Sequence, residues 1–209
     1  MTERLYYTSD ATECLARVVN CSGEADGRYA IELDRTLFHP QGGGQPADRG
    51  WIDELTVESV VARGESIMHI VSQPLPPGEV AIRVDADARQ LHARLHTAGH
   101  LLGQAGERSG WQPVKAHHWP GEGRITFAAG ANASLPEASA LLRQVEVWQA
   151  ENLRRQVSFA GRRRKVGFGD MPGYACGGTH VTSLSELGKV VITQVKMKKG
   201  QMIVSYIVE

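Results

Sequence analysis

Cysteine is scarce in this sequence, with only Cys14, Cys21 and Cys176 among 209 residues. Three thiols are too few to staple a domain, and an odd number leaves at least one unpaired. The sequence also lacks any run close to the roughly 18 apolar residues of a membrane-spanning helix, and residues 1–6 contain no apolar secretion signal. These absences predict reduced thiols, no membrane partner and a cytoplasmic location.

Net charge is missing as well, because 23 Lys and Arg residues balance 23 Asp and Glu residues. Taken alone, a neutral chain gives no indication of a polyanionic partner. The balance conceals an asymmetry: residues 1–90 contain 8 basic and 15 acidic side chains, whereas residues 143–200 contain 11 basic and 4 acidic ones. The charge pattern is therefore compatible with a nucleic acid bound to the C-terminal half.

Strand patterns fill the N-terminal part of the sequence. Apolar residues alternate with polar or small ones at residues 29–33 and again at residues 80–84. Between these patterns, the run Phe38-His39-Pro40-Gln41-Gly42-Gly43-Gly44-Gln45-Pro46 contains three consecutive glycines, which disfavour the interior of a strand or helix. We therefore predict a small all-β domain that carries a glycine-rich loop.

Two helices are predicted further along the chain. Apolar residues recur at helical spacing from residue 87 to residue 106 or 110, with Asp87 as the N-cap. The second helix is expected from residue 134 to about residue 155, because Ser134 and Glu137 form a potential capping box.

Strands are expected after the first helix too. We predict one at residues 124–127 and a terminal hairpin that turns at Lys199-Gly200. The fold class is thus α+β, with a small β-barrel domain at residues 1–86 followed by an α+β domain at residues 87–209.

Two pairs of side chains have the spacing of metal ligands. His96 and His100 stand four residues apart on one face of the first predicted helix, and Cys176 and His180 flank a Gly-Gly turn. Three imidazoles and one thiolate suit Zn²⁺. The alternatives are surface or core histidines and a buried, inert cysteine.

The coordination number stays open at this point. If all four side chains bind the ion, the shell is closed; if one imidazole stays back, water takes the fourth position and becomes more acidic. His92 lies one turn before His96, where it either lines the pocket, orients a ligand or faces solvent.

Both motifs resemble those of one known family. The run His96-Thr97-Ala98-Gly99-His100, followed some 76 positions later by Cys176-Gly177-Gly178-Thr179-His180, is similar to the editing domain of alanyl-tRNA synthetases and of the free-standing AlaX proteins. The run at residues 38–48 resembles the glycine-rich motif of the medium-length AlaX class. Together these resemblances cover nearly the whole chain.

The resemblance implies a fold and an activity. The first domain would be a barrel similar to those of translation factors, and the second the zinc-containing editing fold shared with a threonyl-tRNA synthetase editing domain. The implied activity is hydrolysis, in trans, of mischarged tRNA(Ala), mainly seryl-tRNA(Ala), with glycyl-tRNA(Ala) as a further candidate substrate. An alanine pocket discriminates against such competitors by only about 10–200-fold, so a second hydrolytic site is needed.

The resemblance also assigns residues. One Zn²⁺ would be held by His96, His100, Cys176 and His180. A water bound to or near this ion would attack the ester, or the ion would instead hold the substrate's amino group.

Gln45 falls in the implied editing pocket, where we predict a catalytic role in positioning substrate or water. Gly42, Gly43 and Gly44 are predicted to bind substrate through backbone amides that stabilise developing negative charge. The alternatives are a structural hydrogen bond for Gln45 and a tight turn for the glycines.

Basic residues lie in the same half as the metal motif. We predict that Arg162 and Arg164 contact phosphates of the tRNA, the alternative being a solvated charged face. A histidine of the pair His117-His118 is a further candidate for contact with the substrate hydroxyl.

Two other functions remain open. One is a metallohydrolase of small esters or peptides, which is weakened because Thr97 stands where an H-E-x-x-H motif has its glutamate. The other is a non-catalytic RNA-binding module stabilised by zinc.

Overall fold

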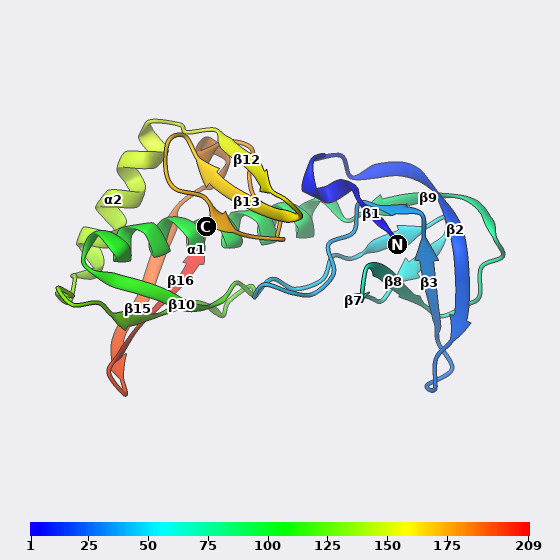
Figure 1. The fold of residues 1–209 in the computed structure, drawn as a ribbon, viewed down its shortest axis with the longest axis horizontal. Coiled ribbons are helices and arrows are strands. Elements are labelled where there is room, and N and C mark those ends of the chain that lie inside the picture. Colours follow the sequence, from blue (N-terminus) through cyan, green and yellow to red (C-terminus); the bar gives the residue numbers. More distant parts are fainter. The chain divides into compact units, whose positions relative to one another are not determined.

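The computed structural model describes all residues, Met1–Glu209, and shows a mixed α/β chain with sixteen strands, two α-helices and two short 3-10 helices (Figure 1). The chain forms two compact units. The first comprises Met1–Gly42 and Pro46–Gln90, and the second comprises Gly43–Gln45 and Leu91–Glu209. Neither α-helix combines the length and the apolar character needed to cross a membrane.

The first unit is built around a seven-stranded antiparallel sheet with the strand order β6-β5-β9-β2-β3-β8-β7. Contacts between β6 and β8 bring the two ends of the sheet together, so that it is nearly closed and barrel-like. This agrees with the predicted small barrel. The strands of this sheet are β2 (Glu13–Gly23), β3 (Tyr29–Leu33), β5 (Gly50–Ile52), β6 (Leu55–Val57), β7 (Ser59–Arg63), β8 (Ser66–Val71) and β9 (Gly78–Val84).

A small parallel pair completes this unit. It consists of β1 (Glu3–Arg4) and β4 (Arg35–Thr36), and the 3-10 helix η1 (Leu5–Tyr7) follows β1. The barrel interior is aliphatic, because the alternating positions of its strands place residues such as Ile31, Ile67 and Ile82 inside.

A buried ion pair fixes the loop that contains the glycine-rich run. Arg89 contacts Asp48, and both side chains are buried. The carboxylate of Asp48 also accepts a hydrogen bond from the His39 amide at 2.6 Å, and the Arg89 guanidinium donates to the Leu37 carbonyl at 2.6 Å. Both ends of the loop are thus tied to the same charged pair.

The second unit contains most of the helix α1 (Ala86–Arg108), together with α2 (Ala138–Ala150) and two sheets. The four-stranded antiparallel sheet has the order β10-β11-β16-β15, and the three-stranded sheet has the order β12-β13-β14. The strands are β10 (Trp111–His117), β11 (Gly123–Ala129), β12 (Arg155–Ala160), β13 (Arg163–Phe168), β14 (Tyr174–Ala175), β15 (Val190–Lys198) and β16 (Gln201–Val208); η2 (Leu184–Glu186) precedes β15.

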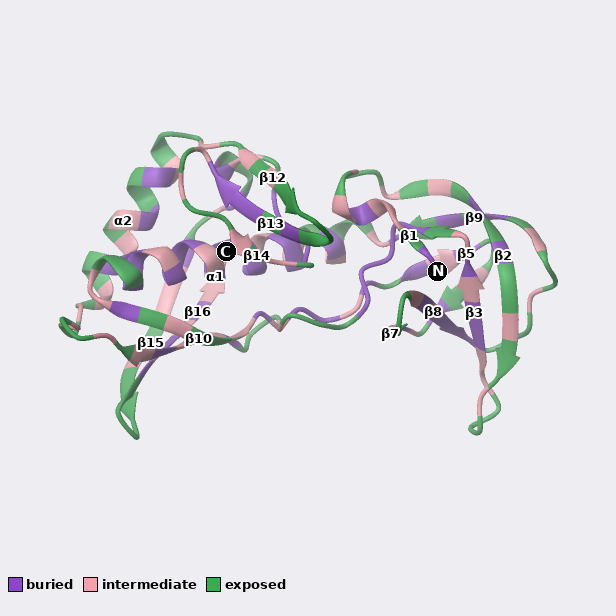
Figure 2. Cartoon of the chain, viewed as in Figure 1, coloured by how far each residue is buried: buried purple, intermediate pink, exposed green.

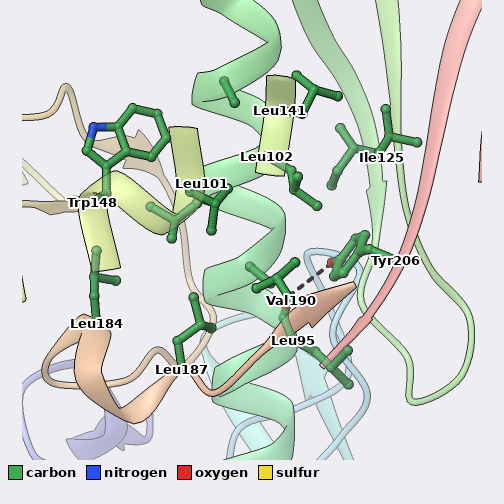
Figure 3. Packing of buried hydrophobic residues seen from close by; sticks show 14 of the residues in the cluster. Leu95, Leu101, Leu102, Ile125, Leu141, Trp148, Leu184, Leu187, Val190 and Tyr206 are labelled. Carbon is green, nitrogen blue, oxygen red and sulfur yellow. Dashed lines mark hydrogen bonds between the residues drawn. The ribbon is translucent and has the colours of Figure 1, made fainter. Parts of the chain in front are cut away.

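One core joins the elements of this unit. Leu95, Leu101 and Leu102 of α1 pack against Trp148 of α2 and Tyr206 of β16 in the same buried cluster (Figure 3). Many residues of α1 are buried, whereas the tip of the β15–β16 hairpin is exposed (Figure 2).

The structure confirms the predicted hairpin and strand and corrects three helix boundaries, one of the first helix and two of the second. Lys199 and Gly200 both have positive φ, 50° and 76°, as a two-residue hairpin turn requires. The first helix is capped by Asp85 instead of Asp87, since the Asp85 carboxylate accepts a hydrogen bond from the Ala88 amide at 3.1 Å.

The second helix begins later and ends earlier than predicted. Ser134 does not cap it: its carbonyl accepts a hydrogen bond from the Trp111 indole, its amide bonds Ser109, and the N-cap is Glu137 without a side-chain bond. Asn152 at φ 48° lies just beyond the C-terminus of the helix. The helix is therefore shorter because the residues before and after it have other backbone partners.

Candidate metal centre and adjoining cavity

The four predicted metal ligands come together in the second unit. His96 and His100 lie one turn apart on α1, and Cys176 and His180 lie on the segment after β14. One ligand atom from each residue lies within 4.8 Å of the others. Cys176 Sγ is 3.4 Å from His96 Nε2 and 3.3 Å from His180 Nε2.

These distances fit a shared tetrahedral ion. Zinc bonds of about 2.0–2.1 Å to nitrogen and about 2.3 Å to sulfur place two tetrahedral ligands about 3.5 Å apart. The chemistry of the donors agrees, because imidazole and thiolate are the ligands that a borderline-soft ion selects. The residues present therefore fit a zinc ion.

Hydrogen bonds orient two of the imidazoles. His96 Nδ1 lies 2.7 Å from Gln45 Oε1, and His180 Nδ1 lies 3.2 Å from Thr97 Oγ1. A proton on each Nδ1 donates to these oxygens, which leaves each Nε2 lone pair directed at Cys176. These hydrogen bonds from the Nδ1 atoms fix both the tautomer and the orientation of each ring before any ion binds.

Burial keeps the ligand nitrogens free of protons. It lowers the pKa of His100 to about 3 and that of His180 well below the ordinary histidine value. Burial also raises the pKa of the Cys176 thiol. Metal binding at this site must therefore release the thiol proton, whereas His100 and His180 need no deprotonation at neutral pH.

Two arginines brace the segment that carries Cys176 and His180. Arg164 donates to the carbonyls of Cys176 at 3.0 Å and Gly178 at 2.8 Å, and Arg155 donates to the His180 carbonyl at 2.7 Å. Arg164 is only 4% exposed. Arg164, which the sequence predicts to contact phosphate, is directed into the protein by the strand alternation of β13 and donates to these carbonyls instead.

Gly178 allows this segment to approach the helix closely. A Cβ at this position would collide with the ring of His96 and lie 2.8 Å from Gln45 Oε1. Any larger residue would therefore separate the two halves of the ligand set.

Gln45 is completely buried and contacts residues on both sides of the ligand set. Its Oε1 also accepts a hydrogen bond from the Thr179 amide at 3.0 Å, and its Nε2 donates to Thr179 Oγ1 at 2.9 Å. These contacts correspond to a structural hydrogen-bonding role for Gln45, which the sequence left open beside a catalytic one.

The three glycines have different surroundings. Gly43 lines the cavity beside the ligands, whereas Gly42 is exposed and belongs to the first unit. Gly44 has φ +79° and its carbonyl accepts a hydrogen bond from the His118 amide at 2.8 Å; a Cβ there would lie 2.6 Å from the Ala116 carbonyl oxygen. Only a glycine fits the backbone at Gly44.

A cavity of about 290 Å³ adjoins the four ligands. Small residues of α1, Gly99 and Gly103, form part of its wall; β10, β11, β14, the glycine-rich loop and the segment after β14 also contribute. Its lining is Gly43, His96, Gly99, His100, Gly103, Pro113, Val114, Lys115, Ala116, His118, Ile125, Tyr174, Ala175, Cys176 and Gly177.

Three aromatic rings surround the ligands; the sequence indicated His118 only as one of a candidate pair and gave no signal for Tyr174 or Tyr206. His118 stacks on His96 with 4.2 Å between ring centroids, and its Nδ1 lies 2.6 Å from the Tyr206 hydroxyl. Tyr174 meets His100 edge to face, at 5.1 Å between centroids. Alternation along the last strand could have placed Tyr206 in the core, but no local pattern identifies its partner.

The remaining predicted residues lie outside this cluster. His92 is buried on α1 but does not join the ligand set, and His117 pairs with Glu122 at 3.3 Å. Arg162 is exposed in the turn between β12 and β13. All three cysteines are free thiols.

Comparison with known proteins places the chain among editing proteins, although no protein-family model matches it. The alanyl-tRNA editing protein AlaX-M of Pyrococcus horikoshii is 31% identical over 200 residues, which cover 91% of this chain and 89% of AlaX-M. AlaX-L of the same organism is 28% identical over 97% of this chain and 56% of AlaX-L. The alanine–tRNA ligase of Pyrobaculum neutrophilum is 30% identical over 82% of this chain but only 23% of the ligase. Because the match to AlaX-M extends over most of both proteins, the chain belongs to the AlaX family of alanyl-tRNA editing proteins.

Proposed function

We propose that this chain hydrolyses the aminoacyl ester of mischarged tRNA(Ala), mainly seryl-tRNA(Ala), in trans and with one Zn²⁺ ion. The observation that carries the proposal is a preformed set of three imidazoles and one thiol beside a small cavity, in a member of the AlaX family. Since the substrate takes part in translation, we place the protein in the cytoplasm.

The donor set defines what the ion contributes. His96, His100, Cys176 and His180 would hold Zn²⁺, and when bound it supplies Lewis-acid polarisation at the ester. Gln45 acts as a positioning residue, because it fixes the ring of His96 and does not line the cavity. Glycyl-tRNA(Ala) is a second candidate substrate.

Gly43 is the part of the glycine-rich loop that faces the reacting group in this proposal. It lines the cavity at φ 58°, and the adjoining Gly44 is held by the His118 amide. We expect the amide of Gly43 to donate to the ester oxygen as negative charge develops there.

Exposed basic residues of the second unit are the proposed phosphate contacts. Arg162, Arg163 and Lys165 lie on the β12–β13 hairpin, and Lys196 and Lys198 lie on β15. Each phosphate contact contributes about 0.7–0.9 to the slope of log affinity against log salt concentration. Affinity for tRNA should therefore fall steeply as salt is added.

The direct test is deacylation of defined substrates. Purified protein is incubated with seryl-, glycyl- and alanyl-tRNA(Ala), with and without a chelator, and the ester that remains is measured. We expect fast loss of seryl-tRNA(Ala), slow loss of alanyl-tRNA(Ala), and no reaction after chelation or in His100→Ala.

Three outcomes would contradict the proposal. Binding of tRNA without hydrolysis would indicate an RNA-binding module. Hydrolysis of small esters but not of aminoacyl-tRNA would indicate a different hydrolase. Full activity in metal-free protein or in His100→Ala would exclude the proposed metal centre.

A further inference from the structure

A buried chain of hydrogen bonds fixes the proton of one histidine at the cavity wall. His118 Nδ1 lies 2.6 Å from the Tyr206 hydroxyl, and that hydroxyl lies 3.0 Å from the Leu95 carbonyl of α1. All three atoms lie in the interior, and Figure 3 shows the bond from Tyr206 toward the helix.

The protons in this chain can be assigned from donor and acceptor chemistry. A carbonyl oxygen only accepts, so the single hydroxyl proton of Tyr206 must go to Leu95. The same hydroxyl oxygen must then accept from His118, which requires a proton on Nδ1. A neutral imidazole carries one ring proton, and therefore His118 Nε2 has a free lone pair.

That nitrogen is an acceptor without a partner. His118 is 2% exposed and lines the cavity, and Nε2 has no hydrogen-bond partner. The ring is held in place because one face stacks on His96 and its Nδ1 bonds the Tyr206 hydroxyl. The backbone amide of His118 is held separately, by the Gly44 carbonyl. An acceptor at the cavity wall gains a direct hydrogen bond when a ligand in the cavity brings a donor.

The rest of the nearby wall offers little competition for a hydroxyl. Gly99, Ala116 and Ile125 are small or apolar, and the Tyr174 hydroxyl already donates to Glu107 at 2.9 Å. The ligand imidazoles are directed at the metal position. His118 Nε2 is thus a fixed acceptor in a wall that otherwise favours a small side chain.

We infer that His118 Nε2 accepts a hydrogen bond from the side-chain hydroxyl of the seryl group and so determines the preference for serine over alanine. The inference rests on the proposed function and deepens it. A methyl group in the same place has no proton to donate to this acceptor, and glycine has no side chain there at all. We expect this to discriminate by about 10- to 100-fold.

Tyr206 is a positioning residue in this scheme. It does not line the cavity and acts only by holding the proton on Nδ1 of His118. Removal of the hydroxyl in Tyr206→Phe should allow both neutral tautomers of His118. The preference for serine over alanine should then weaken, although the imidazole ring is still present.

The test measures binding as well as turnover. Non-hydrolysable amide analogues of 3′-seryl- and 3′-alanyl-adenosine are titrated into zinc-loaded protein by calorimetry, and the tautomer of His118 is read from its ring ¹⁵N shifts. Wild type should bind the seryl analogue about 10- to 100-fold more tightly and show a proton on Nδ1.

Three variants separate the acceptor from the bulk of the ring. His118→Asn places its amide near the former Nδ1 and should lose the preference, whereas His118→Gln reaches toward the former Nε2 and should retain part of it. His117→Asn, at the neighbouring residue outside the cavity lining, should leave the preference unchanged.

The outcomes are distinct for the two proposals. If wild type deacylates seryl-tRNA(Ala) but His118→Asn keeps the full preference in a folded, zinc-loaded protein, the role of His118 is wrong and the proposed function stands. Loss of zinc from His118→Asn would identify His118 as a metal ligand and overturn the inference. Failure of wild type to deacylate any aminoacyl-tRNA would overturn the proposed function and the inference with it.

Discussion

At the residue scale, Gln45 links the glycine-rich loop to the metal ligands through one buried amide. Its oxygen accepts bonds from His96 and the Thr179 backbone, and its nitrogen donates to the Thr179 hydroxyl. The same side chain therefore orients a ligand on α1 and the segment that carries His180.

We expect Gln45→Ala to lower the affinity for Zn²⁺ about 10- to 100-fold, because the Nδ1 proton of His96 loses its acceptor. Competition with a chelator of known affinity measures the change. Gln45→Glu keeps an acceptor facing His96 and should retain more of the affinity. Unchanged zinc affinity in Gln45→Ala would show that His96 needs no second contact.

The cluster of four potential metal ligands could be predicted from sequence, whereas most of the contacts that support it could not. His96 and His100 have local helical spacing, and Cys176 and His180 share one short motif. The contact between His118 and Tyr206 joins residues 88 positions apart and leaves no local pattern. The inward direction of Arg164 depends on the alternation of β13, which the basic run itself does not reveal.

At the element scale, the β12–β13 hairpin presents different residues on its two faces. Arg163 and Lys165 are exposed on β13, whereas Arg164 between them is buried against the carbonyls of the ligand segment. One strand thus contributes both to the basic surface and to the support of the metal site.

A matched pair of variants separates these two contributions. Arg164→Gln should lower the free energy of unfolding by about 1–3 kcal/mol and weaken zinc binding, because buried carbonyls lose their donor. Arg163→Gln should leave stability and zinc affinity unchanged and lower the salt slope of tRNA binding by about 0.7–0.9. Denaturant unfolding and filter binding at several salt concentrations measure both effects. Equal stability of the two variants would argue against the bracing role.

Elements encoded by local patterns could be predicted, whereas the start of α2 could not, because it depends on a distant contact. The turn at Lys199-Gly200 and the periodicity of α1 are local signals. The start of α2 depends on the bond between the Ser134 carbonyl and the Trp111 indole, which comes from a distant strand. Sequence spacing alone does not reveal that another side chain bonds Ser134.

At the scale of the whole molecule, stability depends on histidines that the interior keeps neutral. His69 in the barrel-like unit is fully buried; its Nδ1 donates to the Ile31 carbonyl at 3.0 Å, so its Nε2 accepts from the Thr36 hydroxyl at 2.8 Å. Burial lowers the pKa of His69 from 6.5 to about 4.

We predict that the protein loses stability as the pH falls from 6.5 toward 4. In this window unfolded His69 binds a proton and folded His69 does not, so the unfolded state gains by up to about 1.4 kcal/mol per pH unit; above pH 6.5 the effect is absent. Urea unfolding across this range measures it. His69→Gln removes the titrating group and should show a smaller slope, and an identical slope would contradict the assignment.

The separation of the ligands along the chain has a consequence for folding. His96 and His100 lie on one helix, and Cys176 and His180 come after α2 and the hairpin that follows it. An ion held by all four would act as a crosslink that closes this long chain segment into a loop, and the entropy of loop closure grows only slowly with length. Residues 96–180, which include α2 and the three-stranded sheet, would then be closed by reversible metal–ligand bonds, in a chain whose cysteines are all free thiols.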